Sequence, residues 1–343
     1  MADLRGGLIG CGFFARNHLH AWRDVQGAEI AAVCDMDRDR AATRAAEFDV
    51  PHVYTDAETM LREAGLDFVD VVTQVGSHRP LVELVARHGI PVICQKPLAP
   101  TLEDARAMVA ACREVGVPFM VHENFRWQRP MRQTKRAAAA LGPLFFGRVQ
   151  WRTAWDVYTD QPYLATDERF ILSDMGVHLL DLARFFMGEV SDLRCVTQSV
   201  NPAVRGEDVA TVLLAMRSGA TCVVDMSYAS HLEREMFPQT LVHLEGSGGS
   251  VVLDHDFNLI VTTEAGVERR SVAPGSLPWA TPLVQHVQES VVAIEQDWAD
   301  CLRDGREPET SGADNVKTLE LVFGAYDSAA TGNLIRLDEP ERL

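Results

Sequence analysis

Paired cysteines are missing from this sequence. Seven cysteines occur in 343 residues, and no two of them form a C-x-x-C pair. An odd number of scattered thiols gives no support to a zinc knot or a redox dithiol, so no metal site is expected. Several lie in apolar stretches, which predicts buried thiols in a reducing compartment. The seven are Cys11, Cys34, Cys94, Cys112, Cys195, Cys222 and Cys301.

Long apolar runs and an excess of positive charge are missing too. No apolar stretch approaches the roughly 20 residues that span a bilayer, and the first residues lack the basic and apolar regions of a secretory signal. The 32 basic and 49 acidic side chains leave a net charge of -17, which repels nucleic acid and anionic lipid. We therefore expect a cytoplasmic protein that has neither a membrane nor a nucleic acid as partner.

Strand and helix patterns alternate in the first third of the chain, which favours βαβ units and a doubly wound parallel sheet of the Rossmann type in residues 1–122. Thr101 opens a capping-box sequence, and Gly89 and Gly116 follow predicted helices as C-caps. The patterns predict strands at 4–10, 29–34, 68–73, 91–94 and 117–121, and helices at 13–25, 37–48, 80–88 and 101–115.

The pattern changes after residue 122. Successive strands without intervening helices predict that residues 123–343 form an α/β domain with a large, mainly antiparallel open sheet. The expected strands cover 193–200, 210–216, 220–226, 240–245, 250–253, 259–262 and 334–337, and the expected helices cover 132–140, 175–186, 284–303 and 315–330.

A glycine motif joins the first predicted strand to the first predicted helix. Gly10, Gly12 and Ala15 fit the pattern G-x-G-x-x-[GA]. The first glycine permits a tight turn, the second lets a pyrophosphate approach the backbone, and the small third residue lets helix and strand pack closely. Free N–H groups at the helix start then face the phosphates. Because the motif follows a strand and opens a βαβ run, it indicates a dinucleotide site rather than a structural turn.

Asp35, at the end of the second predicted strand, bears on the choice of cofactor. A carboxylate there accepts hydrogen bonds from the ribose of NAD and repels the 2′-phosphate of NADP. Arg38 and Arg40 follow closely, so NADP stays open as the less favoured alternative.

Several motifs, in this order, resemble those of the glucose–fructose oxidoreductase / inositol dehydrogenase / rhizopine catabolism (Gfo/Idh/MocA) family. The resemblance covers most of the chain. It implies a Rossmann domain, a second α/β domain with a large open sheet, and a homo-oligomer, either a dimer or a tetramer. The motifs are G-C-G-F-F-A-R-N-H at 10–18, V-D-V-V-T-Q-V-G-S-H at 69–78, I-C-Q-K-P-L-A-P at 93–100, N-F-R-W-Q-R-P at 124–130, D-M-G-V-H-L-L-D at 174–181, L-E-G-S-G-G-S at 244–250 and Y-D-S-A-A-T-G at 326–332.

The resemblance implies a catalytic set of Lys96, Asp174 and His178. Lys96 would stabilise the developing oxyanion, His178 would remove the hydroxyl proton, and Asp174 would position the substrate. Without the resemblance, a surface lysine, a helix cap and a core histidine explain these residues as well. On a helix the i, i+4 spacing of Asp174 and His178 would place both on one face.

The glycine motif, the residue types and the resemblance together predict two groups of binding residues. Some have simpler alternatives: His78 as part of a helix start, Arg126 as a bridge between domains, and scattered aromatics as core. The cofactor group is Gly10, Gly12, Phe13, Phe14, Asp35, Thr73, His78, Gln95 and Lys96. The substrate group is Asn124, Arg126, Trp155, Arg169, Asp174 and His178, and Asp156 and Tyr163 are further candidates for a sugar pocket.

Two departures from the family pattern affect the expected site. Gln95 stands where the family usually has glutamate, so we expect Lys96 to lose some electrostatic support. Bulky residues at 168–172 replace a glycine-rich stretch, which should reshape the pocket, and Arg169 could grip a polar group of the substrate.

These inferences predict an oxidoreductase that acts on CH–OH groups. It would oxidise a small sugar or polyol, such as a pentose, apiose or an inositol, by hydride transfer to nicotinamide C4. Two other classes stay open, since one fold hosts many functions. One is a glycosidase-type or substrate-swapping enzyme with tightly bound NAD, and the other is a non-catalytic regulator that senses NAD or a sugar.

Overall fold

The computed structural model describes residues 3–159, 161–233 and 239–337. These residues form two compact units. The N-terminal unit is Met1–Trp127 with Leu277–Ala280 and Val287–Val316, and the C-terminal unit is Gln128–Ser276 with Thr281–His286 and Lys317–Leu343. The first change of unit lies close to the expected boundary after residue 122. The return of residues 287–316 to the N-terminal unit is a feature that the sequence patterns do not predict.

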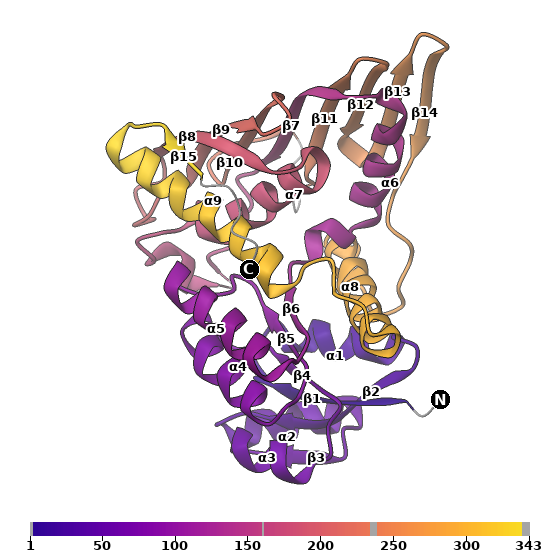
Figure 1. Ribbon diagram of the computed structural model, residues 1–343, viewed down its shortest axis with the longest axis vertical. Coiled ribbons are helices and arrows are strands. Elements are labelled where there is room, and N and C mark those ends of the chain that lie inside the picture. Colours follow the sequence, from indigo (N-terminus) through magenta and orange to yellow (C-terminus); the bar gives the residue numbers. More distant parts are fainter. Residues whose placement is uncertain (1–2, 160, 234–238, 338–343) are drawn as a thin grey trace. The chain divides into compact units, whose positions relative to one another are not determined.

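A six-stranded sheet forms the centre of the N-terminal unit (Figure 1). All of its strand pairs are parallel and run in the order β3-β2-β1-β4-β5-β6. This order reverses between β1 and β4, where doubly wound sheets bind their ligands. The strands are β1 (Leu4–Ile9), β2 (Ala28–Cys34), β3 (His52–Tyr54), β4 (Phe68–Val71), β5 (Val92–Gln95) and β6 (Phe119–His122).

Local capping fixes where the helices of this unit begin and end. Asp37 accepts from the backbone N–H groups of Asp39 and Arg40 at the start of α2, and Thr101 accepts from Asp104 N at the start of α5. Gly116 ends α5 with a left-handed φ of 72°, so the predicted caps are confirmed. The helices are α1 (Ala15–Asp24), α2 (Arg38–Phe48), α3 (Ala57–Glu63), α4 (His78–Arg87) and α5 (Leu102–Val115).

Helix α8 (Gln285–Asp304) explains why residues 287–316 return to the N-terminal unit. Its apolar side chains Ile294, Trp298 and Ala299 are buried in one cluster with Trp22 and Phe68. Burial of apolar surface of this extent stabilises the unit by several kcal/mol, at roughly 25 cal/mol per Å². The Rossmann core of this chain therefore includes a helix from far along the sequence.

A nine-stranded sheet forms the C-terminal unit, in the order β14-β13-β12-β11-β7-β10-β9-β8-β15. Only the pair β7–β10 is parallel, so the prediction of a mainly antiparallel sheet is confirmed. The strands are β7 (Leu144–Arg152), β8 (Val190–Gln198), β9 (Val209–Met216), β10 (Thr221–Ser227), β11 (Leu241–Gly246), β12 (Gly249–Asp254), β13 (Asn258–Thr263), β14 (Gly266–Ser271) and β15 (Ile335–Arg336).

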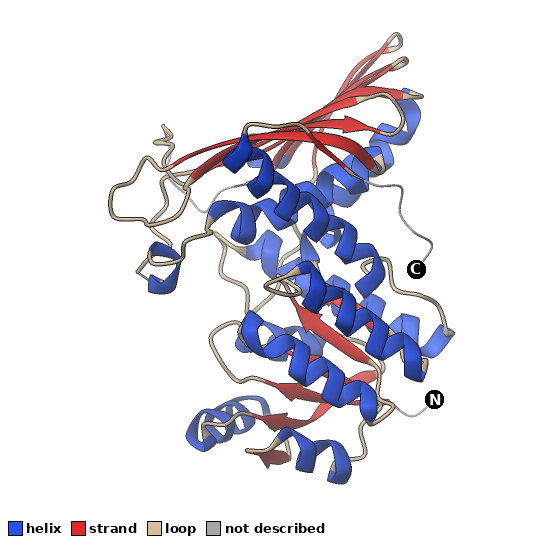
Figure 2. Cartoon of the chain, turned by 60° about the vertical axis from the view of Figure 1, so that its left-hand side comes forward, coloured by secondary structure: helices blue, strands red, loops and turns tan. Residues whose placement is uncertain are grey.

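Helices cover one face of this sheet (Figure 2). Helix α6 (Arg129–Ala138) packs on β11 to β13, and α7 (Val177–Met187) packs on β7 and β10. Helix α9 (Gly312–Thr331) contacts β8, where Ser328 Oγ accepts from Cys195 N at 3.0 Å. No described helix lies on the opposite face, which leaves a broad sheet surface exposed.

Four elements escape the sequence patterns: β3, α3, β7 and β14. Strand β3 has only three residues, and every residue of β14 is exposed. Strand β7 is central, yet Gly147 and Arg148 interrupt its apolar pattern. A Cβ at Gly147 would lie 2.1 Å from Met187 Sδ of α7, so a larger residue there would require the Met187 side chain to shift. Close helix packing thus explains a glycine that weakens the strand signal.

The described residues contain no helix that is long and apolar enough to cross a membrane. All seven cysteines are free and buried, and burial raises the pKa of Cys11, with the nearby Asp35 adding to it, to about 12. The prediction that the thiols are buried is confirmed, and a thiol with so high a pKa is a poor nucleophile.

The buried side chain of Trp298 offers a test of how α8 contributes to the N-terminal unit. We expect Trp298→Ala to lower the free energy of unfolding by roughly 3–5 kcal/mol, because the loss of a fully buried indole leaves a cavity. Trp279→Ala is the matched control, since Trp279 is only half-buried and stacks on His20. Equal chemical-denaturation curves for Trp298→Ala and the control would contradict this packing.

Candidate active site

The turn after β1 depends on a glycine at position 10. Gly10 has a φ of 98°, and a Cβ there would lie 2.4 Å from the carbonyl oxygen of Val72. That carbonyl follows β4, so the turn after β1 packs directly against the loop after β4. A side chain at position 10 would push apart the two strands between which the strand order reverses.

The start of α1 has the features of a phosphate site. A Cβ at Gly12 would meet no protein atom within 4 Å, so the backbone there is open to close approach. The helix has no acidic residue in its first turn and no side-chain cap at Phe14. Its N–H groups and positive dipole end are therefore available to an anion. These features fit the pyrophosphate of NAD, and they agree with the predicted roles of Gly10 and Gly12.

Asp35 lies at the end of β2, as predicted, and its carboxylate also supports the glycine turn. Asp35 Oδ2 accepts from Cys11 N at 2.8 Å, and Oδ1 accepts from Asp37 N at 2.9 Å. Arg40 Nη1 lies 3.6 Å from Oδ2. Asp35 thus fixes the turn between the two motif glycines and keeps lone pairs for a ribose hydroxyl.

The loops after β4 and β5 are tied together by His78. Its Nε2 lies 3.0 Å from Thr73 O, and its Nδ1 lies 3.1 Å from Leu98 O. Burial lowers the pKa of His78, although its hydrogen bonds to backbone carbonyl groups oppose this shift. Thr73 Oγ1 accepts from Ser77 Oγ at 2.8 Å. The structure gives His78 a bridging role between loops, and its contact with a cofactor stays a prediction, as does that of Thr73.

Gln95 and Lys96 end β5, at the same edge of the sheet. Gln95 is buried, and its Oε1 accepts from Lys96 N at 2.7 Å, whereas its Nε2 lies 2.9 Å from His18 Nε2. The Gln95 side chain therefore contacts protein groups on both sides. Lys96 is half-buried, and its predicted role toward substrate and cofactor is compatible with its place in this loop.

Glu123 is an ionisable residue near Lys96 that the sequence motifs do not single out. It directly follows β6 and is fully buried. Burial raises the pKa of Glu123 to about 7, against the opposing charges of Lys96 and Arg126. A carboxylate thus supports the Lys96 ammonium although position 95 carries an amide, which amends the expectation that Lys96 loses this support.

The expected substrate residues Asn124 and Arg126 have partners within the N-terminal unit. Asn124 Nδ2 donates to Ser290 Oγ of α8 at 2.7 Å. Arg126 is buried, and its Nη2 donates to Asp314 Oδ2 at 2.8 Å. Both contacts hold the segment after β6 in place, and binding of substrate by these two residues stays a prediction.

Asp174 and His178 belong to the C-terminal unit. His178 is buried in the first turn of α7, as expected. Asp174 lies before that helix, in a π-helical turn at Leu172–Gly176. The spacing of the two residues therefore spans a π turn and the start of an α-helix, and a common face for them stays a prediction. Such π turns are frequent at functional sites.

Tyr228 is a functional candidate that sequence reasoning missed. It directly follows β10, and its hydroxyl donates to Asp174 Oδ2 at 2.8 Å. Its ring stacks on Phe170 at 4.9 Å and meets Trp151 edge-on at 4.7 Å. Burial, with the nearby Asp174, raises the pKa of Tyr228 well above its usual value, so the hydroxyl stays a donor. It orients the Asp174 carboxylate, and no sequence pattern links residues this far apart.

Glu207 holds the bulky segment that precedes the π turn. Its Oε1 accepts from Phe170 N and Leu172 N at 3.2 and 3.1 Å, and from the Tyr326 hydroxyl at 2.8 Å. The exposed Arg169 places its guanidinium 5.0 Å from the centre of the Tyr326 ring. A cation–π contact therefore holds this arginine, and a grip on substrate stays a prediction.

The remaining expected residues lie in loops. Trp155 is half-buried, and its backbone N–H donates to Thr153 Oγ1. Asp156 accepts from Tyr158 N and so closes a turn, and Tyr163 is 53% exposed. Phe13 is exposed at the glycine turn, whereas Phe14 packs against the core around β1. Their predicted binding roles stay predictions.

Sequence comparisons place the whole chain among known oxidoreductases. Residues 4–123 match the profile of the oxidoreductase family with an NAD-binding Rossmann fold, and residues 103–252 match the GFO/IDH/MocA C-terminal domain. A D-apiose dehydrogenase of Paraburkholderia graminis is 52% identical over 98% of this chain and 90% of its own length. A D-apiose dehydrogenase of Rhizobium rhizogenes is 49% identical over 98% of each chain.

The solved structures give the same result. An oxidoreductase from Agrobacterium radiobacter, in complex with NAD+, L-tartaric acid and magnesium, matches with a TM-score of 0.96 and 48% identity over 98% of each chain. The fold, the glycine turn with Asp35 and these matches agree with one another. The chain belongs to the Gfo/Idh/MocA family of oxidoreductases with an NAD-binding Rossmann domain.

Proposed function

We propose that this protein oxidises a hydroxyl group of a small sugar, with NAD as cofactor and D-apiose as the first substrate to test. The observation that carries this proposal is the identity of 52% and 49%, over nearly the whole chain, to two D-apiose dehydrogenases. Lys96, Asp174 and His178 all stand at their expected positions in the chain. A complete set of this kind favours an enzyme over a non-catalytic regulator.

Lys96 would act on the reacting oxygen. NAD, when bound, supplies the acceptor for the hydride. An ammonium that donates a hydrogen bond to the substrate oxygen favours its alkoxide form. The buried Glu123, whose pKa burial raises to about 7 against the opposing charges of Lys96 and Arg126, places an acidic group near this ammonium. Oxidation of the carbon becomes easier as negative charge develops on its oxygen.

His178 would take the proton of the substrate hydroxyl. A histidine has an ordinary pKa near neutrality, which suits a general base. Asp174 would accept a hydrogen bond from a second substrate hydroxyl, and Tyr228 fixes its direction. A carboxylate that is already held by one donor loses little conformational entropy on binding.

A single assay of NADH formation tests both the catalytic roles and the substrate. We expect Lys96→Ala and His178→Ala each to lower kcat with D-apiose and NAD by about 10²–10⁴-fold, because each variant loses a group that acts in the transition state. NADH absorbance at saturating NAD is the readout, over a panel of D-apiose, pentoses, hexoses and inositols.

The control for this assay is His88→Ala. His88 is a partly buried histidine. It pairs with Glu58 of α3 and is not one of the expected catalytic residues. We expect its turnover to equal that of the wild type. Full turnover by His178→Ala would refute its role as base, and turnover of an inositol but not of D-apiose would refute the substrate.

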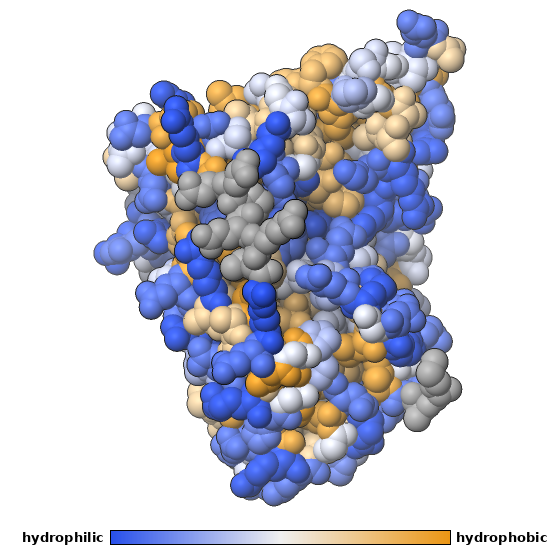
Figure 3. Space-filling view, viewed as in Figure 1, coloured by the Kyte–Doolittle hydropathy of each residue, from blue (hydrophilic) through white to orange (hydrophobic). Residues whose placement is uncertain are grey.

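We propose further that the protein is a cytoplasmic homo-oligomer that uses the open face of the nine-stranded sheet. Val196, Leu213 and Val223 point to that face, and the first two are 65% and 47% exposed. Apolar side chains also interrupt the polar surface over β7, β11 and β12 (Figure 3). An apolar sheet surface of this breadth is typical of a protein interface.

One buried carboxylate on this face has cationic partners. Asp225 of β10 accepts from Arg148 Nε at 2.8 Å and from Arg152 Nη1 at 3.1 Å on β7. A second copy could therefore pack over Asp225 without leaving this carboxylate unpaired. The free thiols of the chain support the cytoplasmic assignment.

A charge in the middle of the open face tests the oligomer. We expect Leu213→Glu to shift the protein to a smaller species in light scattering coupled to size-exclusion chromatography, because a carboxylate would be buried at the interface. Val267→Glu is the matched control, since Val267 is 53% exposed on the edge strand β14. A single, unchanged mass for the wild type and both variants would rule out this interface.

The raised pKa of Glu123 predicts a pH dependence of stability. The folded state resists ionisation of this carboxyl, so its unfavourable contribution appears as pH rises from about 4.5 and is complete above about 7. We expect Glu123→Gln to raise the melting temperature relative to the wild type more at pH 8 than at pH 5. A difference in melting temperature that stays constant between these pH values would show that Glu123 ionises normally.

A further inference from the structure

Gln95 contacts two groups through one side-chain amide. Its Oε1 accepts from the backbone N–H of Lys96 at 2.7 Å, and its Nε2 lies 2.9 Å from Nε2 of His18 in α1. A backbone N–H can only donate, so the amide oxygen must face Lys96. The amide NH₂ group therefore faces His18, and the direction of the amide is fixed by chemistry.

This direction fixes the tautomer of His18. An amide NH₂ only donates, so Nε2 of His18 must accept and carries no proton. The single proton of a neutral imidazole then lies on Nδ1. Nδ1 faces Asp70 Oδ2 at 2.8 Å and Glu295 Oε1 at 3.2 Å, both of which can accept it. Trp22 Nε1 donates to the same Asp70 oxygen at 2.9 Å, which stabilises a carboxylate there.

Two influences on His18 oppose each other. Burial lowers the pKa of His18, whereas the carboxyl groups of Asp70 and Glu295 raise it to about 10. An imidazolium, however, would place an Nε2–H against the amide NH₂ of Gln95, and two donors that face each other in a buried site repel. Turning the amide would only move the conflict to Lys96 N. The hydrogen bonds thus select the neutral ring.

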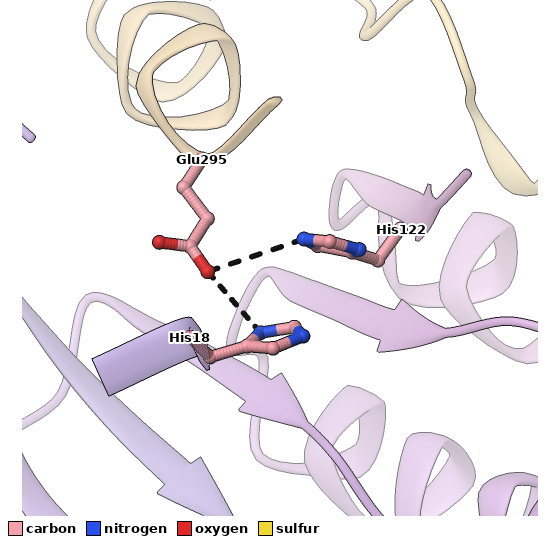
Figure 4. A group of neighbouring side chains, drawn as sticks. All are labelled: His18, His122 and Glu295. Carbon is pink, nitrogen blue, oxygen red and sulfur yellow. Dashed lines mark ion pairs between the residues drawn. The ribbon is translucent and has the colours of Figure 1, made fainter. Parts of the chain in front are cut away.

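The rest of the group fits a neutral His18. Glu295 of α8 is fully buried, and burial raises its pKa well above the usual value. No described group donates to its Oε2, which suits a protonated carboxyl. The ring of His122 of β6 lies beside that of His18 at a tilt of 34°, with ring centres 4.2 Å apart, and its Nε2 lies 4.0 Å from Glu295 Oε1 (Figure 4).

A metal ion is the alternative occupant of this group. His18, His122 and Glu295 each offer a ligand atom, and these atoms lie within 4.8 Å of one another. A metal on Nδ1 of His18 would displace the proton to Nε2, where the Gln95 amide group cannot accept it. The hydrogen bonds therefore disfavour a metal ion at this group, and a titration with Zn²⁺ distinguishes the two alternatives.

We propose that Gln95 is a positioning residue, which fixes the backbone at Lys96 and holds His18 as its neutral Nδ1–H tautomer. Its effect on turnover rests on the proposed role of Lys96, whereas the tautomer does not. The same amide thereby links the buried group around His18 to the loop that carries the catalytic lysine.

Nuclear magnetic resonance of the full chain, with ¹⁵N-labelled histidine, tests the tautomer directly. The wild type at pH 7 should show one ring with a protonated-type Nδ1 and an unprotonated-type Nε2, and this signal should change in Gln95→Glu. In that variant a carboxylate accepts from both Lys96 N and His18 Nε2, so the ring should become an imidazolium with two protonated-type nitrogens. The variant His88→Gln lacks the signal of His88 and so identifies that unrelated histidine in the spectrum.

Three results would overturn the proposal. The first is an imidazolium or an Nε2–H ring at His18 in the wild type, and the second is identical spectra for the wild type and Gln95→Glu. The third is a shift of the His18 and His122 signals when one equivalent of Zn²⁺ is added. These spectra do not depend on activity. They therefore test the tautomer of His18 even if Lys96→Ala keeps its turnover and the proposed function fails.

Turnover tests the link to Lys96. Gln95→Met keeps the length of the side chain but can bond neither partner. We expect it to lower kcat by about tenfold to a hundredfold, since small displacements of a catalytic group are costly, and Gln95→Glu should lose less because it retains the acceptor for Lys96 N. Equal kcat for the wild type and Gln95→Met would overturn the positioning role.

Discussion

The contact between the turn after β1 and the loop after β4 is the constraint on which the N-terminal unit depends. Because Gly10 has no Cβ, its backbone can lie against the Val72 carbonyl. The neighbouring strands then end at a common edge, and the loops after β2, β4 and β5 bring Asp35, Thr73 and Lys96 to that edge. A dinucleotide needs such an edge, with free N–H groups at the helix start and a carboxylate at the next strand.

In the C-terminal unit, distant residues hold a short irregular segment, 168–176, and thereby fix the direction of Asp174. Glu207 and Tyr326 bind the backbone of this segment, and Tyr228 binds the Asp174 carboxylate. Glu207 lies just before β9, Tyr228 directly follows β10, and Tyr326 belongs to α9. A π turn held in this way can carry a functional side chain in a fixed direction, and such turns are frequent at functional sites.

Local signals made much of this structure predictable. The glycine turn, the capped helices and the alternating strands all arise from neighbours in the sequence, and so does Asp35 at the end of β2. What escaped prediction depends on distant partners. Strand β7 has a weak signal because Gly147 makes room for Met187, and α8 enters the Rossmann core only through its packing. Tyr228 and Glu207 have no motif, since only the fold brings them to residues 168–176.

The replacement of glutamate by Gln95 shows how a sequence departure can mislead when it is considered alone. An amide carries no charge, so the sequence predicts weaker support for Lys96. In the fold, Glu123 supplies a carboxyl from the end of β6, and the pKa of that group responds to Lys96. The amide at position 95 has a different role, because it accepts from the backbone N–H of Lys96 and at the same time donates to His18. A carboxylate could not donate, whereas the amide donates to Nε2 and leaves the proton of a neutral His18 on Nδ1 beside Asp70.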